Sequence, residues 1–149
     1  MKITFKKEKG WWPWQRQDLA RRVIHHAKYA TGLVPEEGYA YDIKVKVIFT
    51  KFKNAYGDAY GFEDDSESFE IRLSSKANDR RLVQTIYHEM CHIKQFYFEG
   101  LELGEKPVWK GKTYSSKNYW DAPWEVEARK FEKKYFSIWK KSLDFEGRF

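Results

Sequence analysis

The sequence predicts an α+β fold, in which a small antiparallel sheet packs against three helices. Two short segments alternate apolar and polar residues, which is the pattern of strands with one buried face. Three longer segments repeat apolar residues every three or four positions, which is the pattern of amphipathic helices. The chain has 149 residues and no repeat or low-complexity linker, so we expect a single domain over residues 1–149.

The first helix is expected to run from about Asp18 to Ala30. Apolar side chains recur on one of its faces, and Gly32 follows as a stop signal. The aromatic cluster Trp11–Trp14 precedes this helix and is expected to plug the core against it.

Two strands are expected after this helix. The alternation from Ile43 to Thr50 predicts the first strand, and the alternation from Ser68 to Leu73 predicts the second. Between them, Ala55–Gly61 is rich in turn residues, and Ala59–Phe62 could add a short strand. These strands most simply pair in an antiparallel sheet. The strand Ser68–Leu73 could also pair with an extended peptide substrate by strand addition.

Two further helices are expected in the second half of the chain. Asn78 is a capping residue ahead of a long helical segment that ends before Gly100. A hairpin is expected at Val108–Tyr114. The last helix is expected to begin near Asp121–Pro123, where an acid precedes a first-turn proline, and to run to about Leu143.

The central helix contains the sequence His88-Glu89-Met90-Cys91-His92. Histidines four residues apart lie one turn above each other on nearly the same helix face, so their rings can bind one metal ion. Glu89 lies beside this pair, where it can act as general base toward a metal-bound water without becoming a ligand. The motif therefore predicts a zinc ion held by His88 and His92, with Glu89 catalytic. Cys91 points away from the histidines and is expected to be structural.

A catalytic zinc site takes a third protein ligand. The chain has four histidines, and none follows His92, so this ligand is a carboxylate or one of His25 and His26.

The last helix offers three carboxylates for this position. Glu125 and Glu132 fall inside its apolar arc, where a carboxylate is costly unless a cation compensates it. Glu127 falls just outside the arc, beside lysines. Glu125 lies in the first turn, nearest the preceding loop, and is the expected ligand. Glu127 and Glu132 remain alternatives.

His88–His92, followed by the sequence Glu125-Val126-Glu127-Ala128, resembles the Glu-zincin pattern HExxH…ExxA. It is similar to the ImmA/IrrE-like metallopeptidases and to small phage-encoded SprT-like metallopeptidases. The resemblance implies a minimal zincin-like fold, in which an edge strand aligns the substrate and Glu125 is the third zinc ligand.

One position departs from the family pattern. The residue after ExxA is often an Asp or Asn that steadies a zinc histidine, whereas here it is Arg129, which cannot accept a hydrogen bond. Glu132, Asp121 or a backbone carbonyl must then orient the histidines. Tyr114 and Tyr119, in the loop between the two metal-bearing helices, are candidate donors to an oxyanion.

The net charge is +6, and basic residues are concentrated at both ends of the chain. This balance favours anionic partners, including nucleic acid. The single cysteine cannot form an internal disulfide, and no segment has the pattern of a secretory leader or a membrane span. We therefore expect a cytoplasmic protein without membrane association.

Three functions are compatible with these patterns. The leading expectation is a zinc-dependent hydrolase, an intracellular endopeptidase that cleaves a protein or peptide with water activated by Glu89. The alternative is a basic, nucleic-acid-associated protein in which zinc is structural or accessory. A third is a zincin-like scaffold that binds a partner and has lost turnover.

Overall fold

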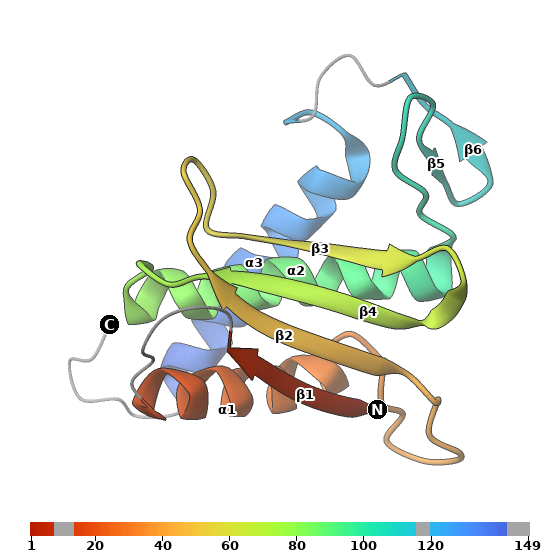
Figure 1. The fold of residues 1–149 in the computed structure, drawn as a ribbon. Helices are drawn as coiled ribbons and strands as arrows, with labels where there is room; N and C mark the ends of the chain where they lie inside the picture. Colours follow the sequence, from red (N-terminus) through yellow and green to blue (C-terminus); the bar gives the residue numbers. More distant parts are fainter. Residues whose placement is uncertain (8–13, 116–119, 143–149) are drawn as a thin grey trace.

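The computed structural model describes residues 1–7, 14–115 and 120–142, and it has the mixed α+β composition that the sequence predicts (Figure 1). The elements in chain order are β1 (Lys2–Lys7), α1 (Trp14–Ala30), β2 (Lys44–Thr50), β3 (Gly57–Phe62), β4 (Asp65–Ser74), α2 (Asp79–Glu99), β5 (Val108–Trp109), β6 (Lys112–Thr113) and α3 (Pro123–Ser142). The predicted hairpin is present as β5 and β6, which pair antiparallel.

The main sheet is mixed, so the expectation of an antiparallel sheet is wrong. Its strand order is β1-β2-β4-β3, with β1, β2 and β4 parallel and only β3 antiparallel to its neighbour. The connection from β1 to β2 contains α1, and a helical crossover of this kind permits parallel pairing. β3 and β4 each reverse the chain direction, so β4 runs the same way as β2. The apolar β4 takes the place beside β2, and the more exposed β3 takes the edge.

β1 was not predicted, although its sequence carries the strand signal. Ile3 and Phe5 alternate with polar residues and pack against the core, and β1 pairs with β2 along its whole length. β1 is short and lies at the edge of the sheet. Only two of its residues therefore show the apolar alternation by which a strand is predicted.

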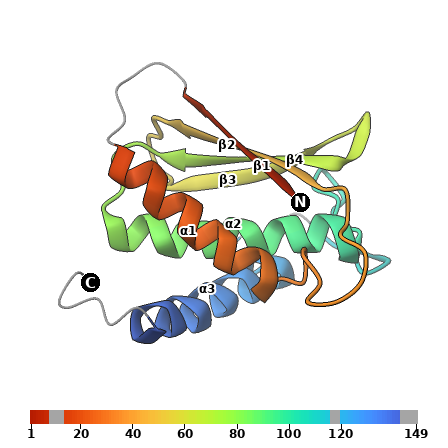
Figure 2. The same cartoon turned by 90° about the horizontal axis from the view of Figure 1, so that it is seen from below.

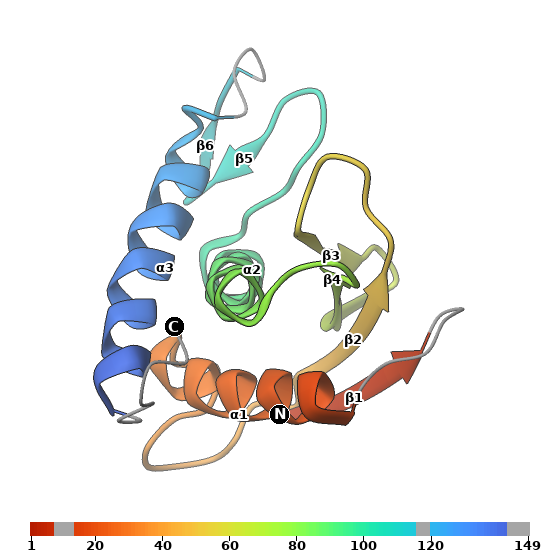
Figure 3. The same cartoon turned by 90° about the vertical axis from the view of Figure 1, so that its left-hand side faces the viewer.

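All three helices cover one face of the sheet, and α2 is the central element (Figures 2 and 3). α2 lies between the sheet and α3, while α1 packs beside α2 and under β1 and β2. The core therefore fills the space between the sheet and α2, with fully buried side chains from α1, the sheet and α2: Leu19, Val23, Val47, Ile71, Leu82, Ile86 and Ile93.

The residues ahead of α1 were expected to fill the core with aromatic side chains. This expectation is wrong for Trp14, the one tryptophan of the cluster that the structure describes. Trp14 begins α1 and is 71% exposed, so it does not fill the core. The rest of the cluster, residues 11–13, lies outside the described residues. Among the helices of the described part of the chain, none combines the length and apolar composition that crossing a membrane requires.

Candidate metal centre

α2 is the element that positions the two histidines. Asn78 caps its first turn by accepting from the backbone N–H of Arg81, and Gly100 ends it in the left-handed conformation. Leu82, Ile86, Met90 and Ile93 are fully buried on the core side, and each such side chain contributes about 1.5–3 kcal/mol to folding. This burial sets the rotation of α2 about its axis, which turns a different face toward α3.

That second face carries His88 and His92, and α3 brings Glu125 against them. Glu125 Oε1 lies 2.9 Å from His92 Nε2, and Glu125 Oε2 lies 3.1 Å from His88 Nε2. One ligand atom from each of the three residues falls within 4.8 Å of the others. Glu125 is 4% exposed, and His92 is 6% exposed. Residues from two helices thus form one compact cluster.

The chemistry of this cluster fits a divalent metal ion. Two imidazoles and one carboxylate are a ligand set of catalytic zinc, which keeps a fourth position open. Ligands at about 2.0–2.2 Å from a tetrahedral centre lie roughly 3.3–3.5 Å apart. The contacts of 2.9 and 3.1 Å between Glu125 and the two rings are shorter than this by only a few tenths of an ångström.

The other nitrogen of each ring is held by an acceptor. His88 Nδ1 lies 3.1 Å from Glu132 Oε2, and His92 Nδ1 lies 2.7 Å from Gln95 Oε1. Gln95 in turn donates from Nε2 to the Trp124 carbonyl, which assigns its oxygen to the histidine. A neutral ring that donates from Nδ1 keeps the Nε2 lone pair for a metal, so both rings are oriented toward the cluster.

The structure separates the three carboxylates of α3 that the sequence left open. Glu125 reaches both Nε2 atoms and Glu132 reaches the far side of His88. Glu127 accepts from Lys94 at 2.8 Å and from Gln95 at 3.2 Å, so its carboxylate is engaged elsewhere. Burial raises the pKa of Glu127, but these donors outweigh it and hold that pKa below its ordinary value.

The remaining histidines and the cysteine lie apart from this cluster. His26 Nδ1 is 2.6 Å from the Tyr87 hydroxyl, and the His25 ring packs edge-on to Tyr29. Cys91 is buried with its Sγ 3.9 Å from Glu127 Oε1, so it also faces α3 but contacts a different carboxylate from the two histidines. Burial raises the pKa of this thiol to about 12, so it is not a reactive thiolate.

Glu89 is buried beside the cluster and borders the same cavity. It is 5% exposed, and burial raises the pKa of its carboxyl to about 7, against the opposing effect of charge on His92 and His88. A divalent cation held by the cluster would lower that pKa and favour the carboxylate. A carboxylate in this position suits a general base.

The two histidines have raised pKa values in the absence of a metal. Burial lowers the pKa of His88, but its bonds to Glu125 and Glu132 outweigh burial and raise it to about 10. Burial also lowers the pKa of His92, and the bond to Glu125 reverses the direction. Metal binding must therefore displace protons from this cluster.

A cleft of about 330 Å3 opens onto the cluster. The beginning of β3 forms one wall, α2 forms the floor, and α3 forms the other wall. Its lining residues include Tyr56, Gly57, Arg81, Thr85, His88, Glu89, Trp120, Glu125, Arg129 and Glu132.

Gly57 allows β3 to approach α2 at this cleft. A Cβ at this position would lie 2.6 Å from Thr85 Cγ2, 2.8 Å from the Arg72 carbonyl oxygen and 3.7 Å from Glu89 Cγ. No side chain fits there without displacement, so glycine lets the edge strand pass directly over the candidate base.

The residues considered for other roles lie as follows. Tyr114 packs edge-on against Trp124 and is not among the residues that line the cleft, and Tyr119 lies outside the described residues. Arg129 lines the cleft, stacks 3.8 Å above the Trp120 ring and donates to the Trp120 carbonyl. Arg129 thus adds positive charge beside the cluster rather than the acceptor common in the Glu-zincin pattern.

Two features of the site escaped the sequence reasoning. The first is Gln95, a fully buried polar residue one turn after His92; its spacing of three residues along a helix was the available signal. The second is the edge strand. β4 is paired on both sides, so the expectation that Ser68–Leu73 adds a peptide strand is wrong, and β3 is the edge strand beside the cleft.

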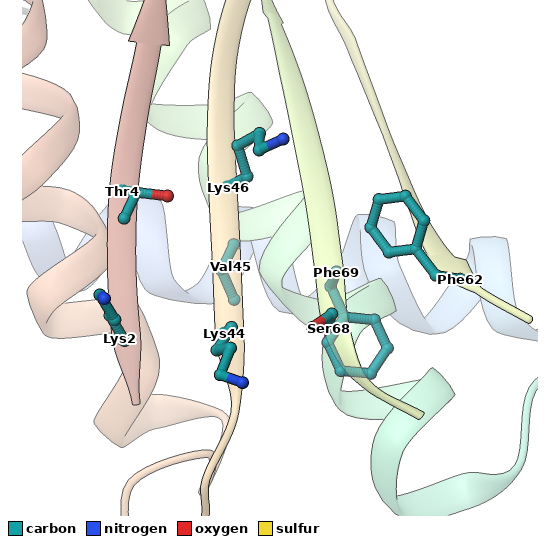
Figure 4. Close-up of a pocket in the computed structure, with 8 residues that line it drawn as sticks. All are labelled: Lys2, Thr4, Lys44, Val45, Lys46, Phe62, Ser68 and Phe69. Atoms are coloured by element: carbon teal, nitrogen blue, oxygen red, sulfur yellow. The ribbon is translucent and has the colours of Figure 1, made fainter. Parts of the chain in front are cut away.

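A second hollow lies on the sheet face that the helices leave uncovered (Figure 4). It has a volume of about 260 Å3, and three lysines on β1 and β2 line one side of it. The lining residues come from all four strands: Lys2, Thr4, Lys44, Val45, Lys46, Phe62, Ser68 and Phe69.

Comparison of the chain with family models, with curated proteins and with solved structures finds no match.

Proposed function

We propose that the protein is a zinc-dependent endopeptidase of the HExxH type, with His88, His92 and Glu125 as the metal ligands. One observation carries the proposal. The Nε2 atoms of both histidines meet the Glu125 carboxylate, while Glu132 and Gln95 hold the opposite ring nitrogens. A cluster that served only to join two helices would not need both ring nitrogens of each histidine to be engaged in this way.

The arrangement of elements supports a minimal zincin-like fold. The helix that carries the motif lies under a sheet, the edge strand β3 borders the cleft, and a second helix supplies the acidic ligand. An extended polypeptide could pair with the free edge of β3 and place a peptide bond above the cluster.

Each residue of the site has a distinct task in this proposal. A bound zinc ion supplies Lewis acidity, which polarises a carbonyl and acidifies water. Glu89 borders the cleft beside the cluster, where its carboxylate would accept a proton from the attacking water and donate it to the leaving amine. Glu132 and Gln95 accept from the Nδ1 atoms and keep the imidazoles oriented, with Nε2 toward the metal position. Arg81 and Arg129 bring positive charge to the cleft, where substrate oxygens would lie.

The proposal is tested by the variant Glu89→Gln, which keeps the side-chain shape and removes the base. The zinc-loaded wild type should cleave members of a proteome-derived peptide library. Glu89→Gln should bind zinc with unchanged stoichiometry and cleave at least about 100-fold more slowly, the usual contribution of a general base. Full hydrolysis by a zinc-loaded Glu89→Gln protein would contradict the assignment.

A second candidate function is association with nucleic acid, and the hollow in Figure 4 favours it. Lys2, Lys44 and Lys46 lie on β1 and β2, across the hollow from an exposed aromatic, Phe62, at the end of β3. Lysines and an aromatic ring are suited to phosphates and stacked bases. Against it, Glu70 pairs in register with Lys46 and offsets part of this charge. Binding of single-stranded DNA that weakens steeply with added salt would support this function, and salt-insensitive binding would remove it.

A further inference from the structure

A groove with a volume of about 590 Å3 lies at the far end of β3 from the metal centre. Its floor is apolar, with Phe69 stacked on Phe96 at 6.2 Å between ring centres. Exposed apolar side chains rise from its rim, where Phe62 is 40% and Leu103 is 53% exposed. Exposed apolar surface of this kind, gathered around a concavity, marks a surface that another molecule covers.

β3 connects this groove to the candidate active site. Gly57, the first residue of β3, and Tyr56 just before it line the cleft above the metal cluster, and Tyr60–Phe62, at the end of β3, line the groove. From Gly57 to Gly61 the strand advances about 13 Å, at roughly 3.3 Å per residue. A polypeptide could pair with the free edge of β3. The part of it that lies in the groove would then be about four residues from its scissile bond.

The charge of the groove is opposite to that of the whole protein. The chain carries 28 basic and 22 acidic residues. The groove is nevertheless lined by the acids Glu63, Asp65 and Glu102, and none of its lining residues is a lysine, arginine or histidine. An apolar floor below an acidic rim fits the aliphatic stem and charged end of a lysine or arginine, together with an adjacent apolar side chain.

We propose that this groove is a substrate-binding site that takes a basic and apolar segment of the polypeptide to be cleaved. The proposal rests on the endopeptidase function proposed above and adds the class of substrate. Antiparallel pairing with β3, the more stable geometry, would place the segment about four residues before the scissile bond. Nucleic acid is disfavoured in the groove because phosphates would face Glu63, Asp65 and Glu102.

The binding step can be measured without turnover. The Glu89→Gln protein would be titrated into each of two fluorescein-labelled peptides of about twelve residues. Both peptides have an Ala/Ser/Thr background, and they differ only in that one carries Lys-Leu-Lys where the other carries Glu-Leu-Glu. We expect the Lys-Leu-Lys peptide to bind at least about tenfold more tightly, from two favourable charge contacts. The double variant Glu63→Lys with Glu102→Lys should abolish this preference.

A matched control separates the groove from the overall charge. Glu36 and Glu37 are exposed acids in the loop between α1 and β2, outside the lining of the groove. Glu36→Lys with Glu37→Lys changes the net charge equally and should leave the peptide preference intact. Equal affinity for the two peptides, or equal loss in both double variants, would overturn the proposal.

The failure of this proposal is distinguishable from failure of the proposed function. Zinc-dependent cleavage could be abolished in Glu89→Gln and yet show no preference for basic residues before the cut. This result would leave the endopeptidase proposal standing and overturn the assignment of the groove as a substrate-binding site. Sedimentation that showed self-association, lost in the Glu63→Lys with Glu102→Lys protein, would assign the groove to a second copy of the chain and overturn it as well.

Discussion

Glu125 is the residue on which the candidate metal centre depends most. It lies in the first turn of α3, is almost completely buried, and has a histidine Nε2 against each carboxylate oxygen. A buried carboxylate needs compensating positive charge, and charged His88 and His92 can provide it when no metal is bound. A divalent cation would provide it with the rings neutral. The same residues can therefore exchange protons for a metal ion.

Glu132 should affect metal affinity without being a ligand. Its carboxylate accepts from His88 Nδ1 at 3.1 Å, so Glu132→Ala removes the group that orients this ring. Loss of such a partner typically lowers metal affinity by about 10- to 100-fold. We expect zinc competition with a chromophoric chelator to give this reduction, with Glu36→Ala, an exposed acid far from the cluster, as the control. An affinity equal to that of wild type would show that Glu132 does not orient the histidine.

The sequence was sufficient to identify His88, Glu89, His92 and Glu125 as candidates, because helical spacing places each on a defined face of its own helix. It offered Glu132 as one of three candidates to orient the histidines without deciding between them, and it did not identify Gln95. The contact of Glu132 with His88 depends on how α2 and α3 are rotated against each other, which the tertiary packing decides. Gln95 is local to His92, yet a glutamine in a helix is common and carries no signal until its burial is known.

At the scale of elements, the site depends on the close approach of β3 to α2. Gly57 makes this possible, because a Cβ there would overlap the Thr85 side chain and the Arg72 carbonyl oxygen. β3 combines weak strand propensity with an edge position, which explains why much of it looked like a turn in the sequence.

Gly57→Ala should therefore destabilise the fold. The added methyl group must displace backbone as well as side chain, and overpacking of this kind costs about 1–3 kcal/mol. The matched control is Gly104→Ala, because a Cβ at Gly104 meets no atom within 4 Å. Thermal unfolding should show a lower Tm for Gly57→Ala only. An unchanged Tm would mean that β3 is not held against α2 as the structure has it.

The contact between His26 of α1 and Tyr87 of α2 should make the stability of the fold depend on pH. His26 contacts the Tyr87 hydroxyl, and burial, together with the neighbouring His25, lowers the pKa of His26 below its ordinary value of 6.5. As the pH falls below about 6.5, the unfolded chain gains a proton at this residue before the folded chain does. The contribution of His26 to the free energy of unfolding should therefore fall in this range and level off below its folded pKa.

The variant His26→Gln isolates this effect, because glutamine can accept from Tyr87 but does not titrate. We expect wild type to become less stable relative to His26→Gln as the pH is lowered from 7 to 5. Urea unfolding at several pH values measures it. A difference that stays constant over this range would show that His26 titrates equally in the folded and unfolded chain.

At the scale of the whole molecule, local periodicity predicted most of the elements and not how they pair. The helices and the strands β2 and β4 follow from patterns of burial within each segment. The order β1-β2-β4-β3 depends on contacts between segments far apart in the chain, and it determines which strands lie at the edges of the sheet. Substrate pairing was accordingly expected at β4 and is now assigned, as a proposal, to β3.

The distribution of charge is also a property of the whole molecule. A net charge of +6 suggested an anionic partner, and the lysines on the uncovered sheet face agree with that suggestion. The groove at the end of β3 has the opposite sign. Each surface therefore has to be considered by its own residues, since the total charge predicts the partner of neither one.

The most direct test of the central claim is the zinc content of the protein after equilibrium dialysis against a zinc-buffered solution. The account predicts about one zinc ion per chain in the wild type, in keeping with a single three-ligand site. Glu125→Ala should lose most of this zinc, whereas Glu127→Ala, two residues along the same helix, should keep it. A wild type that binds no zinc, or a Glu125→Ala protein that binds as much as wild type, would contradict the account.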